Sequence, residues 1–86
     1  MTPENFNLFI DDIVKSNNIK LEREFLHKGL YIEKKMTWGD VINIIKEYED
    51  NFEYCVKILR DCKTDSDVYA TLMFIAGTLI RYHHLF

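Results

Sequence analysis

The stretch TWGDVINIIKEYEDNFEYCVKILRDC, residues 37–62, decides the expected fold. Its apolar residues recur at alternating steps of three and four, which is the spacing of one face of a helix. These positions are Trp38, Val41, Ile45, Tyr48, Phe52, Cys55, Leu59 and Cys62. A strand would instead be apolar at every second position. We therefore predict one continuous helix over residues 37–62, begun by a capping box between Thr37 and Asp40.

A second helix is predicted directly after this one. Residues 63–67, KTDSD, supply the residue types of a turn and an N-cap. The same alternation then resumes at Val68, Leu72, Ile75, Leu79, Tyr82 and Phe86. Because two helices joined by a short turn fold back on each other, residues 37–62 and 66–84 are expected to form a long antiparallel helical hairpin.

The second helix of this hairpin is apolar on nearly every side. No charged residue occurs from Val68 to Ile80. Such a helix needs cover nearly all round, which the N-terminal segments or a second subunit would have to supply. Gly77 costs about 1 kcal/mol in a helix interior relative to Ala, which indicates a packing reason for it. The uncharged run is shorter than the ~20 residues of a membrane-spanning helix.

An N-terminal helix is predicted over residues 3–16. Thr2-Pro3-Glu4 has the residue types of a helix start. An apolar face follows at Phe6, Phe9, Ile10 and Ile13, and Ser16-Asn17-Asn18 is typical of a helix end. This helix is expected to cover the hairpin.

Residues 19–28 leave two alternatives open. A short helix is favoured by the charge pairs Lys20–Glu24 and Glu24–Lys28, by Gly29 as its end, and by the composition of LEREFL. A β-hairpin is indicated by alternation from Ile19 to Phe25, with a turn at Gly29 and a return strand at Leu30-Tyr31-Ile32. We favour the helix, so the expected fold is an all-α bundle.

Length and charge limit the classes of function. With 86 residues and a net charge of −3, the chain is expected to be one helical domain, residues 1–86, that binds no nucleic acid. Cys55 and Cys62 would lie about 10 Å apart on one helix, too far for a disulfide, which favours a reducing compartment. Met1-Thr2-Pro3-Glu4 lacks the basic residues of a secretion signal. We therefore expect a cytoplasmic location and no membrane partner.

The residues able to carry chemistry do not form a catalytic motif. Glu47, Glu49, Asp50 and Glu53 have the spacing of magnesium-binding helix pairs, but the facing helix carries no acid. His83 and His84 are adjacent and do not match zinc-ligand spacing. The glycines are isolated, so no phosphate-binding loop exists. We predict that the protein is not an enzyme and holds no metal or cofactor.

Apolar and aromatic side chains are the remaining signal, and they favour contact with a protein. The candidate contact residues are Tyr31, Trp38, Tyr69, Met73, Phe74, Gly77 and Ile80. We expect a small cytosolic protein-interaction module, a self-associating accessory, inhibitor or modulator protein of the phage or immunity type. Its partners would be itself, as a dimer or higher oligomer, and another protein.

Two alternatives for the function stay open. The first is a helical oligomer that binds or sequesters a nucleotide, with Tyr31 stacking a base and Lys34 or Lys35 binding phosphate. The expected architecture is loosely similar to that of phage proteins that sequester cyclic nucleotides as oligomers. The second alternative is a metal-dependent enzyme that uses the acidic row Glu47–Glu53.

Overall fold

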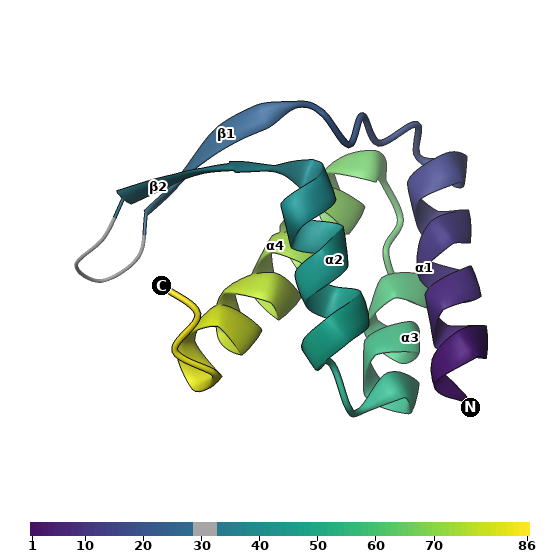
Figure 1. The fold of residues 1–86 in the computed structure, drawn as a ribbon. Coiled ribbons are helices and arrows are strands. Elements are labelled where there is room, and N and C mark those ends of the chain that lie inside the picture. The colour runs from purple at the N-terminus through teal and green to yellow at the C-terminus, as the bar shows by residue number, and fades with distance from the viewer. Residues whose placement is uncertain (29–32) are drawn as a thin grey trace.

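The computed structural model describes residues 1–28 and 33–86, which form four helices and a two-stranded antiparallel sheet (Figure 1). In chain order the elements are α1 (Pro3–Ser16), β1 (Glu24–Lys28), β2 (Glu33–Thr37), α2 (Trp38–Tyr48), α3 (Phe52–Arg60) and α4 (Asp65–Tyr82). The expected all-α class is therefore wrong. The fold is mostly helical but includes a β-hairpin.

The predicted N-terminal helix is confirmed by α1, together with both of its ends. The Thr2 hydroxyl accepts a hydrogen bond from the backbone N–H of Asn5 at 3.1 Å, and Pro3 opens the helix. At the other end the backbone N–H of Asn17 donates to the carbonyl of Ile13, and Asn18 takes a left-handed φ of 51°. Local residue types are sufficient to set these ends.

The short helix predicted over residues 19–28 is wrong, because β1 is extended and pairs with β2. Phe25 lies opposite Met36, and Lys28 lies opposite Glu33. The β-hairpin alternative gives the right kind of element, but the described return strand, Glu33–Thr37, lies beyond the residues that it assigned. The turn proposed at Gly29 and the return at residues 30–32 lie outside the described residues.

Burial explains why extended structure replaces the helix in this segment. Met36 is buried, and the ring of Phe25 lies 5.2 Å from that of Trp38 between centroids. Burying an apolar side chain of this size stabilises by about 1.5–3 kcal/mol. Each charge pair of the alternative helix would contribute only about 0.2–0.5 kcal/mol. Glu24 also keeps a charge partner across the strands, since Lys35 Nζ lies 2.9 Å from its carboxylate.

The continuous helix predicted over residues 37–62 is also wrong, because the chain breaks it into α2 and α3. Its start is as expected: Thr37 and Asp40 form the capping box, with hydrogen bonds of 2.9 and 3.1 Å. Glu49 then leaves the helix with an extended backbone, φ −69° and ψ 128°.

Asn51 is the N-cap residue with which helical structure begins again as α3. Its side-chain oxygen accepts a hydrogen bond from the backbone N–H of Tyr54 at 3.3 Å, and its own N–H donates to the Glu49 carboxylate at 3.0 Å. The apolar spacing continues through this break, because both helices turn their apolar residues toward the same core. Spacing alone therefore does not reveal the interruption.

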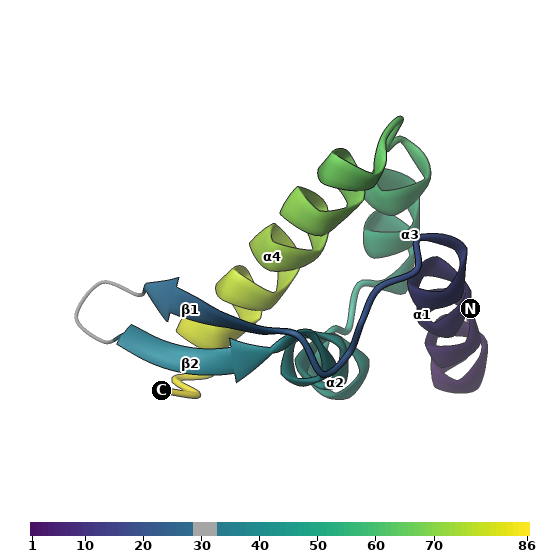
Figure 2. The same cartoon turned by 90° about the horizontal axis from the view of Figure 1, so that it is seen from above.

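The two arms of the predicted hairpin are still packed together, with α4 against α2 and α3 (Figure 1). The N-terminal helix covers a different part of the hairpin from the one that needs it. Helix α1 packs on α2 and α3, and Figure 2 shows no other described element on the side of α4 that faces away from α2. One side of α4 is therefore left without cover by residues 1–28 and 33–86.

A single hydrophobic core draws on all six elements. Phe6 of α1 stacks on Phe52 of α3 with ring centroids 4.5 Å apart. An ion pair between Lys46 and Asp11 ties α2 to α1 at the surface. The largest fully buried side chains are those of Phe6, Ile10, Val41, Ile45, Cys55 and Leu72.

Replacing Asn51 with Ala distinguishes the observed break from a continuous helix by the sign of its effect. Because the Tyr54 N–H loses its acceptor, Asn51→Ala is expected to lower the free energy of unfolding by about 1 kcal/mol. In a continuous helix the same change would raise it, since Ala has the higher helix propensity. Urea unfolding followed by circular dichroism measures the difference.

Asn43 provides the matched control, because it is exposed within α2. Asn43→Ala is expected to be neutral or to stabilise by up to about 0.7 kcal/mol. A stabilising effect of Asn51→Ala would contradict the break between α2 and α3.

Candidate functional site

The uncovered side of α4 is the candidate functional site. At 3.6 residues per turn, six residues fall within an arc of about 100° on this side. They are Ser66, Ala70, Met73, Phe74, Gly77 and Arg81, and we call them the α4 surface. None of them is buried: Met73 and Gly77 are half-buried and the other four are exposed.

The opposite side of α4 belongs to the core. Its buried residues are Val68, Leu72, Ile75, Ala76, Leu79 and Ile80. The cover nearly all round that the apolar sequence of α4 led us to expect is not provided by the described chain. Half of the helix is anchored, and the other half is presented to the surroundings.

Phe74 is the largest apolar side chain of the α4 surface, and it is 62% exposed. Full burial of a Phe side chain stabilises a protein by about 1.5–3 kcal/mol, and an exposed Phe74 does not contribute most of this free energy. Single exposed apolar side chains are common on proteins. Phe74, however, stands within a helix that has no charged residue from Val68 to Ile80. A continuous apolar face of this kind is typical of an interaction site.

Gly77 leaves a gap in the side-chain layer next to Phe74. A Cβ atom added there would meet no described atom within 4 Å beyond its two neighbours in sequence and the adjoining backbone of α4, and the glycine does not have a positive φ. The described chain therefore contains neither a packing nor a backbone reason for Gly77, although a glycine costs a helix interior about 1 kcal/mol relative to Ala.

The structure brings together three of the seven contact residues predicted from the sequence, namely Met73, Phe74 and Gly77. Trp38 and Ile80 lie in the core, and Tyr69 is half-buried with its ring 4.9 Å from that of Trp38 between centroids. Tyr31 lies outside the described residues. Trp38 and Ile80 thus pack inside the chain and are not available for contact with a partner.

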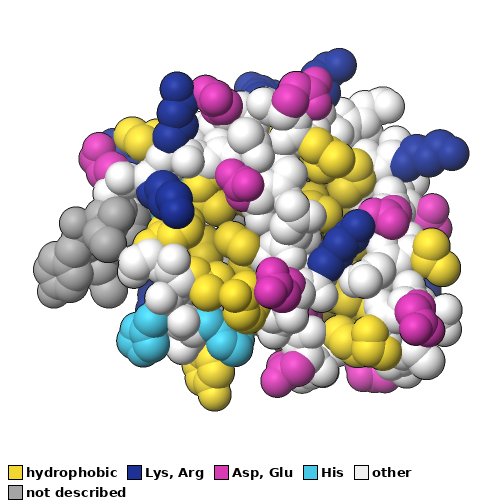
Figure 3. All heavy atoms as spheres, in the orientation of Figure 1, with side chains coloured by type: hydrophobic (Ala, Val, Ile, Leu, Met, Phe, Trp, Pro, Cys, Tyr) yellow, Lys and Arg dark blue, Asp and Glu magenta, His cyan; other side chains and the backbone are white. Residues whose placement is uncertain are grey.

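A second surface feature is an open hollow of about 240 Å³ between β2, α2 and the last residues of the chain (Figure 3). It is lined by Lys34, Met36, Asp40, Asn43, Ile44, Glu47 and Phe86. Lys34 Nζ lies 4.4 Å from the centroid of the Phe86 ring, so an aromatic ring and a cation meet here. The carboxylates of Asp40 and Glu47 line the same hollow and would repel a phosphate.

This hollow could not be predicted from the sequence, because no local pattern of residues indicates it. The apolar spacing places Phe86 on a continued helix, but α4 ends at Tyr82. His84 then takes a left-handed φ of 52°, and the chain turns so that the Phe86 ring lies edge-on to His27 at 5.7 Å between centroids. Only the path of the folded chain brings these rings together.

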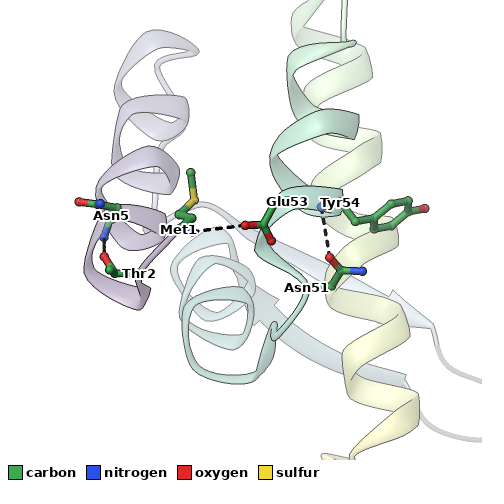
Figure 4. A network of polar contacts seen from close by, with 6 residues as sticks. All are labelled: Met1, Thr2, Asn5, Asn51, Glu53 and Tyr54. Carbon is green, nitrogen blue, oxygen red and sulfur yellow. Dashed lines mark hydrogen bonds and ion pairs between the residues drawn. The ribbon is translucent and has the colours of Figure 1, made fainter.

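The acidic row Glu47–Glu53 is divided by the break between α2 and α3. The Glu49 carboxylate accepts a hydrogen bond from the backbone N–H of Asn51. The Glu53 carboxylate accepts one from the Met1 amino group at 3.3 Å, as Figure 4 shows. The Glu53 backbone N–H and the Met1 amino group lower the pKa of Glu53. Within residues 1–28 and 33–86, no group of three or more His, Cys, Asp or Glu side chains is placed to hold a metal ion.

The two cysteines differ in their surroundings. Cys55 is fully buried, and burial, with a smaller contribution from the Glu49 carboxylate, raises the pKa of its thiol to about 12. Cys62 is half-buried, and its Sγ lies 3.4 Å from the Ile58 carbonyl and 3.3 Å from Thr71 Oγ1. Both are free thiols.

Comparisons with protein-family models, with curated proteins and with solved structures found no match. Helices α1 to α4 include none with the length and hydropathy needed to cross a membrane. The α4 surface is therefore the feature of the molecule that indicates a function.

The thiol of Cys55 is expected to resist alkylation in the folded protein. At pH 8 a thiol with a pKa of about 12 stays protonated, and the thiol form is the unreactive one. Iodoacetamide should therefore modify Cys62 first, and mass spectrometry should show a long-lived singly modified species. In urea both cysteines should react at similar rates, and equal rates without urea would contradict the burial of Cys55.

Proposed function

We propose that this chain is a small protein-interaction module that binds another protein through the α4 surface. The observation that carries the proposal is the exposure of Phe74 on a helix face that has no charged residue between Asp67 and Arg81. Aromatic and Met side chains are enriched in protein interfaces, and charged residues are depleted at their centres.

The anchoring of α4 supports this role. Its inner side is held by the core, so the backbone that carries the α4 surface is already ordered before a partner arrives. Little conformational entropy is then lost on binding. Docking would remove the side chains of Met73 and Phe74 from water, which contributes about 25 cal/mol per Å² of apolar area.

Photo-crosslinking at position 74 tests the proposal. A photoreactive benzoyl-phenylalanine in place of Phe74 is expected to form covalent adducts with a protein partner when the variant is irradiated in its host cells. Mass spectrometry of the purified adducts identifies the partner, including a second copy of this chain.

Leu8 gives a matched control, because it lies on α1 and is also 62% exposed. The same photoreactive residue at position 8 is expected to form far fewer adducts. Equal yields at both positions, or none at position 74, would contradict docking at the α4 surface.

The narrower roles stay predictions within this proposal. They include the accessory, inhibitor or modulator role, of the phage or immunity type, and the absence of enzymatic activity. A cytoplasmic location is part of the same proposal. It is supported by the free thiols of Cys55 and Cys62, since cysteines remain reduced in that compartment.

A further inference from the structure

We propose that the occupant of the α4 surface is a second copy of this chain, with the two α4 helices antiparallel around a two-fold axis. The inference rests on the proposed docking role and names the partner. The axis passes between Met73 and Phe74. Ala70 then faces Gly77 of the second copy, Met73 faces Phe74, and Ser66 faces Arg81.

The α4 surface is complementary to itself in this register. Its two largest apolar side chains, Met73 and Phe74, stand together at the middle, and its two smallest residues, Ala70 and Gly77, stand at equal distances on either side. A two-fold axis brings each small residue opposite the other small one, so both pairs of backbones can approach closely. The Phe74 side chains then pack at the centre, where an interface is most apolar.

This arrangement explains why a glycine occupies position 77, which the contacts within a single chain do not explain. Apart from the two neighbours of Gly77 in sequence and the adjoining backbone of α4 itself, no described atom lies within 4 Å of the position of its missing Cβ. A helix of a second copy, crossing with Ala70 next to Gly77, would occupy that space. The closeness of the two backbones would then account for a glycine in the interior of a helix.

Charge complementarity selects the antiparallel direction and the second copy as the occupant. Asp67 and Arg81 flank the uncharged run at opposite ends, and both are exposed. Antiparallel pairing places each Arg81 next to Asp67 of the second copy, at both ends of the interface. Parallel pairing would place Arg81 next to Arg81 and would also align the two helix dipoles.

The area available sets the strength of the expected association. Helix α4 has 18 residues, so it extends for about 27 Å at ~1.5 Å per residue. At a helix width of ~10 Å this face covers only ~300 Å² on each copy, so two such faces are expected to bury less than the ~1,200 Å² at which stable interfaces begin. The dimer is therefore expected to be in rapid equilibrium with the monomer, with a micromolar or weaker dissociation constant.

Sedimentation velocity of the full chain, from low micromolar to millimolar concentration, is expected to show a monomer–dimer equilibrium. Gly77→Ala separates the dimer from the fold. Because Ala favours helix and its methyl meets no described atom beyond the adjoining backbone of α4, the variant should raise the Tm of the dilute protein by about 4–8 °C. The same methyl should weaken dimerisation at least about tenfold, since it collides with the second copy.

A charge exchange tests the register. Arg81→Glu and Ser66→Lys should each weaken the dimer about fivefold, because each places like charges together twice across the two-fold axis. The double variant restores opposite charges and should return to within about twofold of the original dissociation constant. Lys15→Glu is the control: it makes the same charge change one residue before the end of α1 and should not alter dimerisation.

Each failure has its own meaning. A chain that stays monomeric at every concentration overturns the inference, and so does a dimer that tolerates Gly77→Ala and Arg81→Glu. A double variant no tighter than either single variant overturns the register. If position 74 crosslinks only to another protein, the proposed docking role stands and the second copy is wrong. If it crosslinks to nothing, both are wrong.

Discussion

The packing of one side of α4 against α2 and α3 is the interaction on which the rest of the structure depends. It buries Leu72, Ile75 and Ala76 and fixes the helix in place. The same packing decides what stays outside. Because α1 also lies on α2 and α3, it cannot cover the far side of α4. The core is therefore complete while the far side of α4 stays exposed. This exposed apolar face is the part of the molecule able to bind a partner.

The break between α2 and α3 allows the packing of α1 and α4. A straight helix over residues 37–62 would extend for about 39 Å at ~1.5 Å per residue, longer than the whole described molecule, which measures 34 Å at most. Two shorter helices instead place Phe52 against Phe6 and Cys55 in the core. The cap at Asn51 lowers the free-energy cost of the interruption, because its side chain accepts a hydrogen bond from one of the first N–H groups of α3. The division also separates the carboxylates of the acidic row.

The candidate site was predictable in its chemistry but only partly in its members. The uncharged run in α4 indicated Met73, Phe74 and Gly77 as contact residues, because an apolar helix needs neighbours to cover it in any fold. The run could not separate them from Ile80, since residues on both sides of α4 lie within the same uncharged stretch. Trp38 was an equally plausible contact residue until the fold enclosed it between Phe25 and Tyr69. The hollow around Phe86 left no trace in the sequence, because its lining comes from three separate parts of the chain.

The sequence by itself determined the local features of this protein: the caps at Thr2 and Thr37, the ends of α1, and the helical character of α2 to α4. Those features depend on hydrogen bonds and side chains within a few residues of one another. Only the tertiary structure decided the break before Asn51, the extended state of β1 and the uncovered side of α4. Each of these follows from burial against residues distant in the chain, whose free energy exceeds the local preferences that a sequence pattern reports.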